Sequence, residues 1–320
     1  MYKLYRINEV YKMSKAKSNI LVVSLGGTIT SELSGGVVRQ SVLAWDASFF
    51  EKIDGRFIYD LVAMSGYSSE NATVADYRKA LTGIAEAVGK FEPSGVLILH
   101  GTDSIAFFAQ LAIRVLSHLN LPVVITGSKM PPSQSGSDAI GNIRLSLGFL
   151  GAGIEGKIGS KTFGVVFNDS FMEESTFVHA SSCTSPDIMG DIKSFIDSGA
   201  KRKIDFKSQE YRKRAESFIA GGGVHGGVIT IPAAPGFPYE ALSTEGAEAV
   251  VIECYHSGTA DSKGLCEFVR RARSEGIPCY MGPCPSRGNV YESRKLLEEA
   301  GVITLKGMPF EGCWAEAVLG

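Results

Sequence analysis

Two segments of the sequence share one pattern, an apolar run that ends in glycine and threonine. Residues 20–25 lead into Gly-Gly-Thr28, and residues 96–99 lead into His-Gly-Thr102-Asp103. A short apolar run closed by glycine is typical of a buried parallel strand followed by a loop. Ligands of open α/β sheets bind outside the carboxyl ends of such strands. We therefore expect both threonines and Asp103 to lie in a functional site.

Helical periodicity alternates with these apolar runs. Apolar residues recur at spacings of three and four over residues 74–88 and 105–119, which predicts helices with one buried face. Further strands are predicted over 122–126 and 163–167, with a helix over 140–150 between them. Alternating strands and helices indicate βαβ units and a parallel sheet.

A second alternation follows a polar stretch. Charged and glycine-rich residues between 201 and 223 predict an exposed connection. We expect an α/β protein with a larger, doubly wound, flavodoxin- or Rossmann-like parallel-sheet domain over residues 1–205, a linker over 206–222 and a smaller α/β domain over 223–320. The elements predicted in the smaller domain are strands near 227–231, 249–253 and 277–281 and helices near 262–275 and 290–300.

Composition and charge narrow the classes of function. A net charge of −2 over 320 residues argues against a nucleic-acid surface, which needs a basic face. No apolar stretch approaches the ~20 residues of a membrane span, and the N-terminus lacks the apolar core of a signal peptide. Six scattered cysteines are interpreted as reduced thiols of a cytoplasmic protein. Cys279 and Cys284 lack a second pair or a histidine cluster nearby, so we expect no metal.

The motifs GGTIT (26–30) and HGTDS (100–104) resemble the two signature blocks of the bacterial-type L-asparaginase/glutaminase family, which includes the asparaginase-like subunit of the archaeal glutamyl-tRNA amidotransferase. The resemblance implies the asparaginase fold and hydrolysis of a small carboxamide amino acid, asparagine first and glutamine second, through an acyl-threonine with release of ammonia. It implies no cofactor and a homodimer or homotetramer. The similarity continues through SENAT (69–73), TGS (126–128), SDA (137–139), Asn168-Asp169 and, weakly, MPFE (308–311).

The resemblance also implies roles for individual residues. Thr28 matches the nucleophile, while Thr102 and Asp103 match the catalytic set, in which the aspartate also binds substrate. Ser69 and Glu70 match the pair that grips the α-carboxylate and α-amino groups of the substrate. Further substrate contacts are expected at Gly27, Gly101 and Ser128. Without the resemblance, the alternatives for the Gly-Gly-Thr segment are a phosphate-binding turn or a simple turn that ends a strand. The segment lacks the residues of a phosphate loop.

The sequence departs from this family where a proton must be moved. A threonine hydroxyl is a poor nucleophile until a neighbour takes its proton, and the family uses a lysine and usually a loop tyrosine for this. The lysine position falls on or next to His179, no lysine lies between Lys161 and Lys193, and residues 31–44 contain no tyrosine. Imidazole, with an unperturbed pKa near ~6.5, accepts protons at neutral pH. His179 is therefore a candidate catalytic residue, and an ordinary loop residue is the alternative.

These departures leave other functions open. One is a catalytically altered homologue that binds an amino acid, and another is an enzyme that acts on a modified amide or ester. A third is an ammonia-supplying amidotransferase subunit, whose known form has an extra N-terminal domain, whereas only 25 residues precede Gly26 here. Family members continue beyond the position of Gly320, so a truncated C-terminus is also open. His256 lies in a segment that weakly matches one reaching a neighbouring subunit's site in the family.

Overall fold

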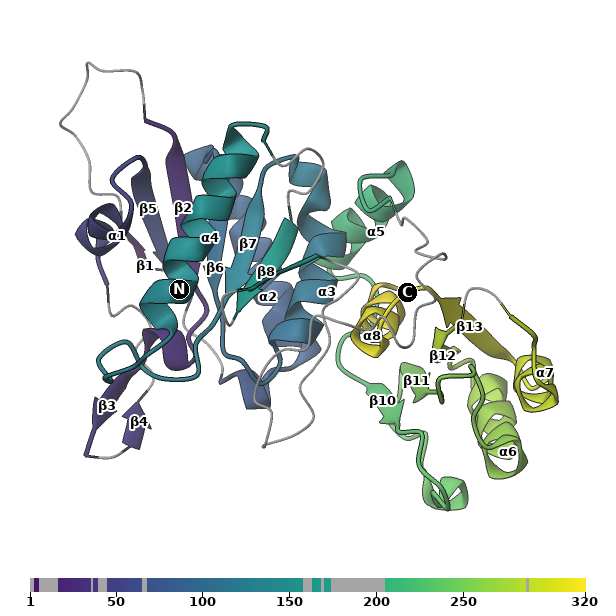
Figure 1. Ribbon diagram of the computed structural model, residues 1–320. Coiled ribbons are helices and arrows are strands. Elements are labelled where there is room, and N and C mark those ends of the chain that lie inside the picture. The colour runs from purple at the N-terminus through teal and green to yellow at the C-terminus, as the bar shows by residue number, and fades with distance from the viewer. Residues whose placement is uncertain are drawn as a thin grey trace. The chain divides into compact units, whose positions relative to one another are not determined.

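The computed structural model describes two compact units, one within residues 3–173 and one from residue 205 onward (Figure 1). Each unit contains a parallel sheet with helices, so the predicted α/β class is confirmed. The predicted boundary at residue 205 borders residues that are not described. The described residues are 3–5, 17–35, 37–39, 45–64, 68–157, 163–167, 170–173, 205–285 and 288–320.

The first unit is built on a seven-stranded sheet in the order β1-β5-β2-β6-β7-β8-β9. Its five central strands are parallel, and β1 and β9 pair antiparallel at the edges. The chain passes from β2 to β5 and then to β6 on the other side of β2. This reversal makes the gap between the ends of β2 and β6 the switch point at which such sheets bind ligands. The strands are β1 (Lys3–Tyr5), β2 (Asn19–Ser24), β5 (Ile58–Ala63), β6 (Gly95–Leu99), β7 (Val123–Thr126), β8 (Phe163–Phe167) and β9 (Ser170–Glu173).

Helices cover both faces of this sheet because alternate strand residues point to opposite sides. Ile20 and Val22 of β2 share one core with Phe50 of α1 and Leu147 of α4. Helices α2 and α3 contact the strands without joining this core, so the intervening residues, such as Leu21, face them. The helices are α1 (Ala47–Ile53), α2 (Val74–Phe91), α3 (Ile105–Leu116) and α4 (Ala139–Ile154), and a hairpin joins β3 (Glu32–Ser34) to β4 (Val37–Arg39).

The second unit has a four-stranded parallel sheet in the order β10-β11-β12-β13. Val250 and Ile252 of β11 face a core that includes Phe268 of α6, whereas Val251 faces Cys313 of α8 on the opposite side. The elements are α5 (Gln209–Ile219), β10 (Val228–Ile231), β11 (Ala249–Glu253), α6 (Ser262–Ser274), β12 (Cys279–Cys284), α7 (Glu292–Glu299), β13 (Val302–Lys306) and α8 (Phe310–Leu319). None of the described helices of either unit is long and apolar enough to cross a membrane.

The expected linker over residues 206–222 is wrong for most of its length, because this segment forms α5 within the second unit. The Tyr211 hydroxyl donates to Glu316 Oε1 at 2.7 Å. Arg214 donates from Nη1 to Glu316 Oε2 at 2.8 Å and from Nη2 to its carbonyl oxygen at 3.2 Å. Phe218 is fully buried on the same helix. The charged composition therefore belongs to an amphipathic helix that is fastened to α8 through one buried carboxylate.

Replacing Glu316 tests this attachment. We expect Glu316→Ala to lower the free energy of unfolding by about 3 kcal/mol, because the partly buried side chains of Arg214 and Tyr211 then lose their charged hydrogen-bond acceptor. The matched control is Glu216→Ala, which removes an exposed ion pair of 3.0 Å with Arg212 on the same helix. The control should change stability by at most about 0.5 kcal/mol. Urea denaturation measures both values, and equal losses would contradict the attachment.

Candidate functional site

Three loops meet at the switch point of the first sheet with almost no space between their backbones. A Cβ atom added to Gly27 would lie within 2.5 Å of the Gly101 backbone nitrogen. One added to Gly101 would lie 2.6 Å from Ser69 Cβ, and one added to Gly127 would lie 2.8 Å from the His100 carbonyl oxygen. Real Cβ contacts essentially never come so close. Glycine is therefore required at positions 27, 101 and 127. These are the points at which the loops after β2, β6 and β7 contact one another or the segment after β5.

The turn after β2 presents Thr28. Gly27 has φ +87° and ψ 176°, a conformation that is nearly exclusive to glycine. Its carbonyl oxygen accepts hydrogen bonds from Thr30 N at 3.1 Å, Thr30 Oγ1 at 3.2 Å and Ser31 Oγ at 2.8 Å. These bonds hold a short 3₁₀ turn, η1 (Thr28–Thr30), in which Thr28 is half-buried. Within the described parts of the chain, no hydrogen bond engages the Thr28 hydroxyl.

The segment after β5 is tied to the segment after β6. Ser69 begins the 3₁₀ turn η2 (Ser69–Asn71), and its hydroxyl donates to Asp103 Oδ2 at 3.0 Å. The Ser104 hydroxyl donates in turn to the Ser69 carbonyl oxygen at 2.6 Å. Ser69 is buried whereas Asp103 is exposed. One carboxylate oxygen of Asp103 is thus fixed by the protein, and the residue remains open to a cationic group from solvent.

The other predicted site residues differ in what they contact. Thr102 is half-buried, with its Cγ2 methyl near Gly127. Glu70 is exposed in η2. Ser128 is buried, and its hydroxyl donates to the Met130 carbonyl oxygen at 2.9 Å. That bond favours a role for Ser128 in holding its own loop.

Asp138 holds the loop after β7, a role that the sequence analysis missed. Its carboxylate accepts from Lys129 N at 3.0 Å, from Met130 N at 3.3 Å and from Asn142 Nδ2 at 3.0 Å. The same Asn142 amide donates to the Gly127 carbonyl oxygen at 2.9 Å. Asp138 stands at the N-cap of α4 without capping it. Its position before a helix signals an ordinary cap, so sequence alone does not reveal the loop contacts.

His100 has a structural role at the end of β6. The imidazole is fully buried, with Nδ1 2.7 Å from the Gly101 carbonyl oxygen and its ring stacked on Phe108 at 4.6 Å between centroids. Burial lowers the pKa of His100 to about 4, against the opposing effects of the Gly101 hydrogen bond and the Asp103 charge. The ring is therefore neutral at pH 7, and its Nδ1 proton fixes the end of β6.

Two other expectations concern the proton acceptor and metals. His179 lies outside the described residues, so its role as a base stays a prediction, and Asn168-Asp169 lies outside them as well. Among the described residues no group of three or more histidine, cysteine or acidic side chains is placed to hold a metal ion. Cys279 and Cys284 are buried free thiols.

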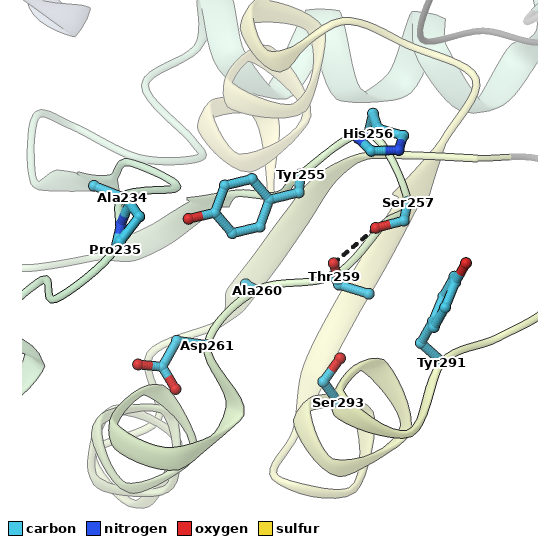
Figure 2. Close-up of a pocket in the computed structure, with 10 residues that line it drawn as sticks. All are labelled: Ala234, Pro235, Tyr255, His256, Ser257, Thr259, Ala260, Asp261, Tyr291 and Ser293. Carbon is cyan, nitrogen blue, oxygen red and sulfur yellow. Dashed lines mark hydrogen bonds between the residues drawn. The ribbon is translucent and has the colours of Figure 1, made fainter.

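A pocket of about 540 Å³ belongs to the second unit and contains none of the predicted site residues (Figure 2). His256 is among its lining residues. Several polar side chains of the pocket already form hydrogen bonds within the protein. Ser257 Oγ and Thr259 Oγ1 lie 2.8 Å apart, and the Asp261 carboxylate accepts from Lys263 N and so caps α6. The aromatic part of the lining consists of Tyr255 and Tyr291.

The close approach of Gly101 and Ser69 predicts the effect of one methyl group. Gly101→Ala should destabilise the protein by about 1–3 kcal/mol through overpacking and displace Ser69 from Asp103. The control is Gly141→Ala on α4, where an added Cβ meets nothing within 4 Å. That change should stabilise the protein by roughly 0.5–1 kcal/mol, because alanine is the better helix former. Thermal unfolding compares the two, and a neutral Gly101→Ala would contradict the packing.

Burial of His100 predicts a pH dependence of stability. The unfolded chain takes up a proton near pH 6.5 and the folded protein only near pH 4, so stability is complete above pH 6.5 and falls as the pH drops toward 4. Over this range the free energy of unfolding should fall by about 3 kcal/mol through the His100 ionisation. His100→Gln should flatten this part of the urea-denaturation profile, whereas His225→Gln, at an exposed histidine, should leave it unchanged. Parallel profiles for wild type and His100→Gln would refute the assignment.

Comparison of the sequence with known proteins identifies relatives of this chain. The family model described as "Asparaginase, N-terminal" matches residues 19–193. The chain is 29% identical over 310 residues to the D subunit of glutamyl-tRNA(Gln) amidotransferase from Methanopyrus kandleri, covering 89% of this chain and 66% of the relative. It is 24% identical over 322 residues to the corresponding protein of Sulfolobus acidocaldarius, covering 92% and 69%. The chain thus spans about two thirds of the length of these relatives.

Solved structures show the same fold. The thermostable L-asparaginase from Thermococcus kodakarensis superposes with a TM-score of 0.64 at 22% identity, covering 94% of this chain and 92% of that one. L-asparaginase I from Vibrio cholerae gives a TM-score of 0.61 at 20% identity, covering 95% and 92%. The asparaginase fold that the sequence motifs implied is therefore confirmed. Because the family model covers more than half of the sequence, this chain belongs to the asparaginase family.

Proposed function

We propose that this protein is an amidohydrolase that acts on a small amino-acid amide, with asparagine as the first candidate and glutamine as the second. The observation that carries the proposal is the hydrogen bond between Ser69 and Asp103 beside the Gly27–Gly101 contact, at the switch point of the sheet. It supplies a fixed, accessible carboxylate for an α-ammonium group close to the turn that bears Thr28. Membership of the asparaginase family supports the same reaction class.

In the proposed reaction, Ser69, Glu70 and Asp103 bind the α-carboxylate and α-amino groups of the substrate. The Thr28 oxygen forms a bond to the carboxamide carbon while its proton passes, directly or through the Thr102 hydroxyl, to a base, for which the His179 imidazole is the candidate. The carbon–nitrogen bond then breaks and the nitrogen leaves as ammonia after gaining a proton. Water attacks the acyl-threonine ester, which releases the amino acid and restores the hydroxyl. We further propose that the enzyme is a cytoplasmic homo-oligomer and needs no cofactor.

A second candidate function is that of an amidotransferase component that supplies ammonia to a protein partner. The observation that favours it is the similarity to the amidotransferase relatives over about nine tenths of this chain. The hydrolytic chemistry is the same in both candidates. They differ in whether the ammonia is released to solvent or passed to a companion protein that acts on glutamyl-tRNA.

The proposal predicts that Thr28→Val removes catalysis without removing binding. Ammonia release from L-asparagine and L-glutamine should fall by about 10⁴-fold, because the nucleophile is lost. Binding of L-aspartate by calorimetry should stay within about threefold, because the groups that grip the amino acid lie on other loops. Thr28→Ser, which keeps a hydroxyl, should retain measurable turnover.

The outcomes of this assay separate the candidates. Full activity in Thr28→Val would refute Thr28 as the nucleophile. Ammonia release that appears only when a companion protein is added would favour the amidotransferase role. Amino-acid binding by the wild type with no release of ammonia from any amide would show a binding protein instead of an enzyme.

A further inference from the structure

Ser104 stands at the N-cap of α3, but its side chain does not cap the helix. A serine at this position ordinarily accepts a hydrogen bond from a backbone N–H two or three residues later. Here the hydroxyl instead donates to the Ser69 carbonyl oxygen at 2.6 Å. The helix thus forgoes its usual side-chain cap, and the hydroxyl joins two segments that are far apart in the sequence. Departures from local preference of this kind are expected at functional sites.

The backbone of Ser104 is itself held from two helices. Its carbonyl oxygen accepts from Phe108 N at 3.0 Å within α3 and from the Tyr77 hydroxyl of α2 at 3.3 Å. Tyr77 is buried and packs edge-on against Phe108, with ring centroids 5.3 Å apart. Ser104 therefore donates to Ser69 from a backbone that two packed helices fix.

Ser69 is consequently constrained on three sides. Its carbonyl accepts from Ser104, its hydroxyl donates to Asp103, and its side chain packs directly against Gly101. Loss of the Ser104 bond would free the Ser69 backbone to rotate, and the hydroxyl that holds Asp103 would move with it. The orientation of the Asp103 carboxylate thus depends on Ser104, whose hydroxyl bonds to the Ser69 carbonyl oxygen and not to Asp103.

We propose that Ser104 is a positioning residue that sets Ser69 and Asp103 for the α-amino end of the substrate, and so determines the preference for amides of α-amino acids over amides that lack the amino group. This inference rests on the proposed amidohydrolase function.

The test compares Ser104→Ala with a matched variant on the same helix. Ser117, at the other end of α3, also donates its hydroxyl to a backbone carbonyl, that of Ile113. Ser104→Ala should raise KM for L-asparagine by about 3- to 10-fold, the effect of one neutral hydrogen bond. It should raise KM by a smaller factor for succinamate, which keeps the carboxylate that Ser69 contacts but lacks the α-amino group. Ser117→Ala should leave both substrates unaffected, and Ser104→Thr should restore the wild-type KM.

Hydrogen exchange gives a readout that does not need activity. In Ser104→Ala the amides of residues 71 and 72, which bond to the carbonyls of Ser68 and Ser69, should exchange faster, whereas Ser117→Ala should leave them unchanged. Unchanged exchange in Ser104→Ala, or an equal rise of KM for both substrates, would overturn the inference. Absence of ammonia release from any amide in the wild type would refute the proposed function, and exchange would still decide whether Ser104 holds Ser69.

Discussion

The site depends first on a contact between two backbones. Gly27 lies so close to the Gly101 backbone that it cannot carry a Cβ atom, and Ser69 excludes a Cβ atom at Gly101 in the same way. These contacts bring together the loops after β2 and β6 and the segment after β5. The sheet order supplies the place, because the chain reverses direction across the sheet between these two strands. Thr28, Ser69 and Asp103 take their positions relative to this contact. A side chain at either glycine would separate the residues that the proposed reaction requires together.

Two helices give up side-chain caps to hold the loops around this contact. Ser104 before α3 donates to Ser69, and Asp138 before α4 accepts from the loop after β7. A side-chain cap is worth about 1 kcal/mol, so each diversion exchanges local helix stability for a fixed loop. The buried His100 acts in the same sense, since its neutral ring bonds to the Gly101 carbonyl oxygen. Much of the polar chemistry near the site therefore positions other residues.

The sequence predicted those parts of the fold that have a strong periodic signal. The buried strands β2 and β6 and the helices α2 and α3 are confirmed close to their expected bounds, because their apolar spacing reflects burial on one or two faces. Helix α5 was mistaken for a linker because its attachment depends on Glu316, about one hundred residues later in the chain. The loop contacts of Ser104 and Asp138 escaped prediction for the same reason: a residue before a helix signals a cap, and only tertiary structure shows where its side chain goes. The glycine–threonine motifs mark the ends of β2 and β6, and the structure brings the two loops that carry them into contact.

The proposed function requires that the Ser69–Asp103 pair at the switch point receives the α-amino acid portion of a substrate. A crystal structure of the protein with L-aspartate tests it most directly. We expect aspartate beside Thr28, with its α-ammonium group within hydrogen-bond distance of the Asp103 carboxylate and its α-carboxylate against Ser69. Aspartate bound instead in the pocket between Tyr255 and Tyr291, with the Ser69–Asp103 hydrogen bond undisturbed and the switch point empty, would contradict it.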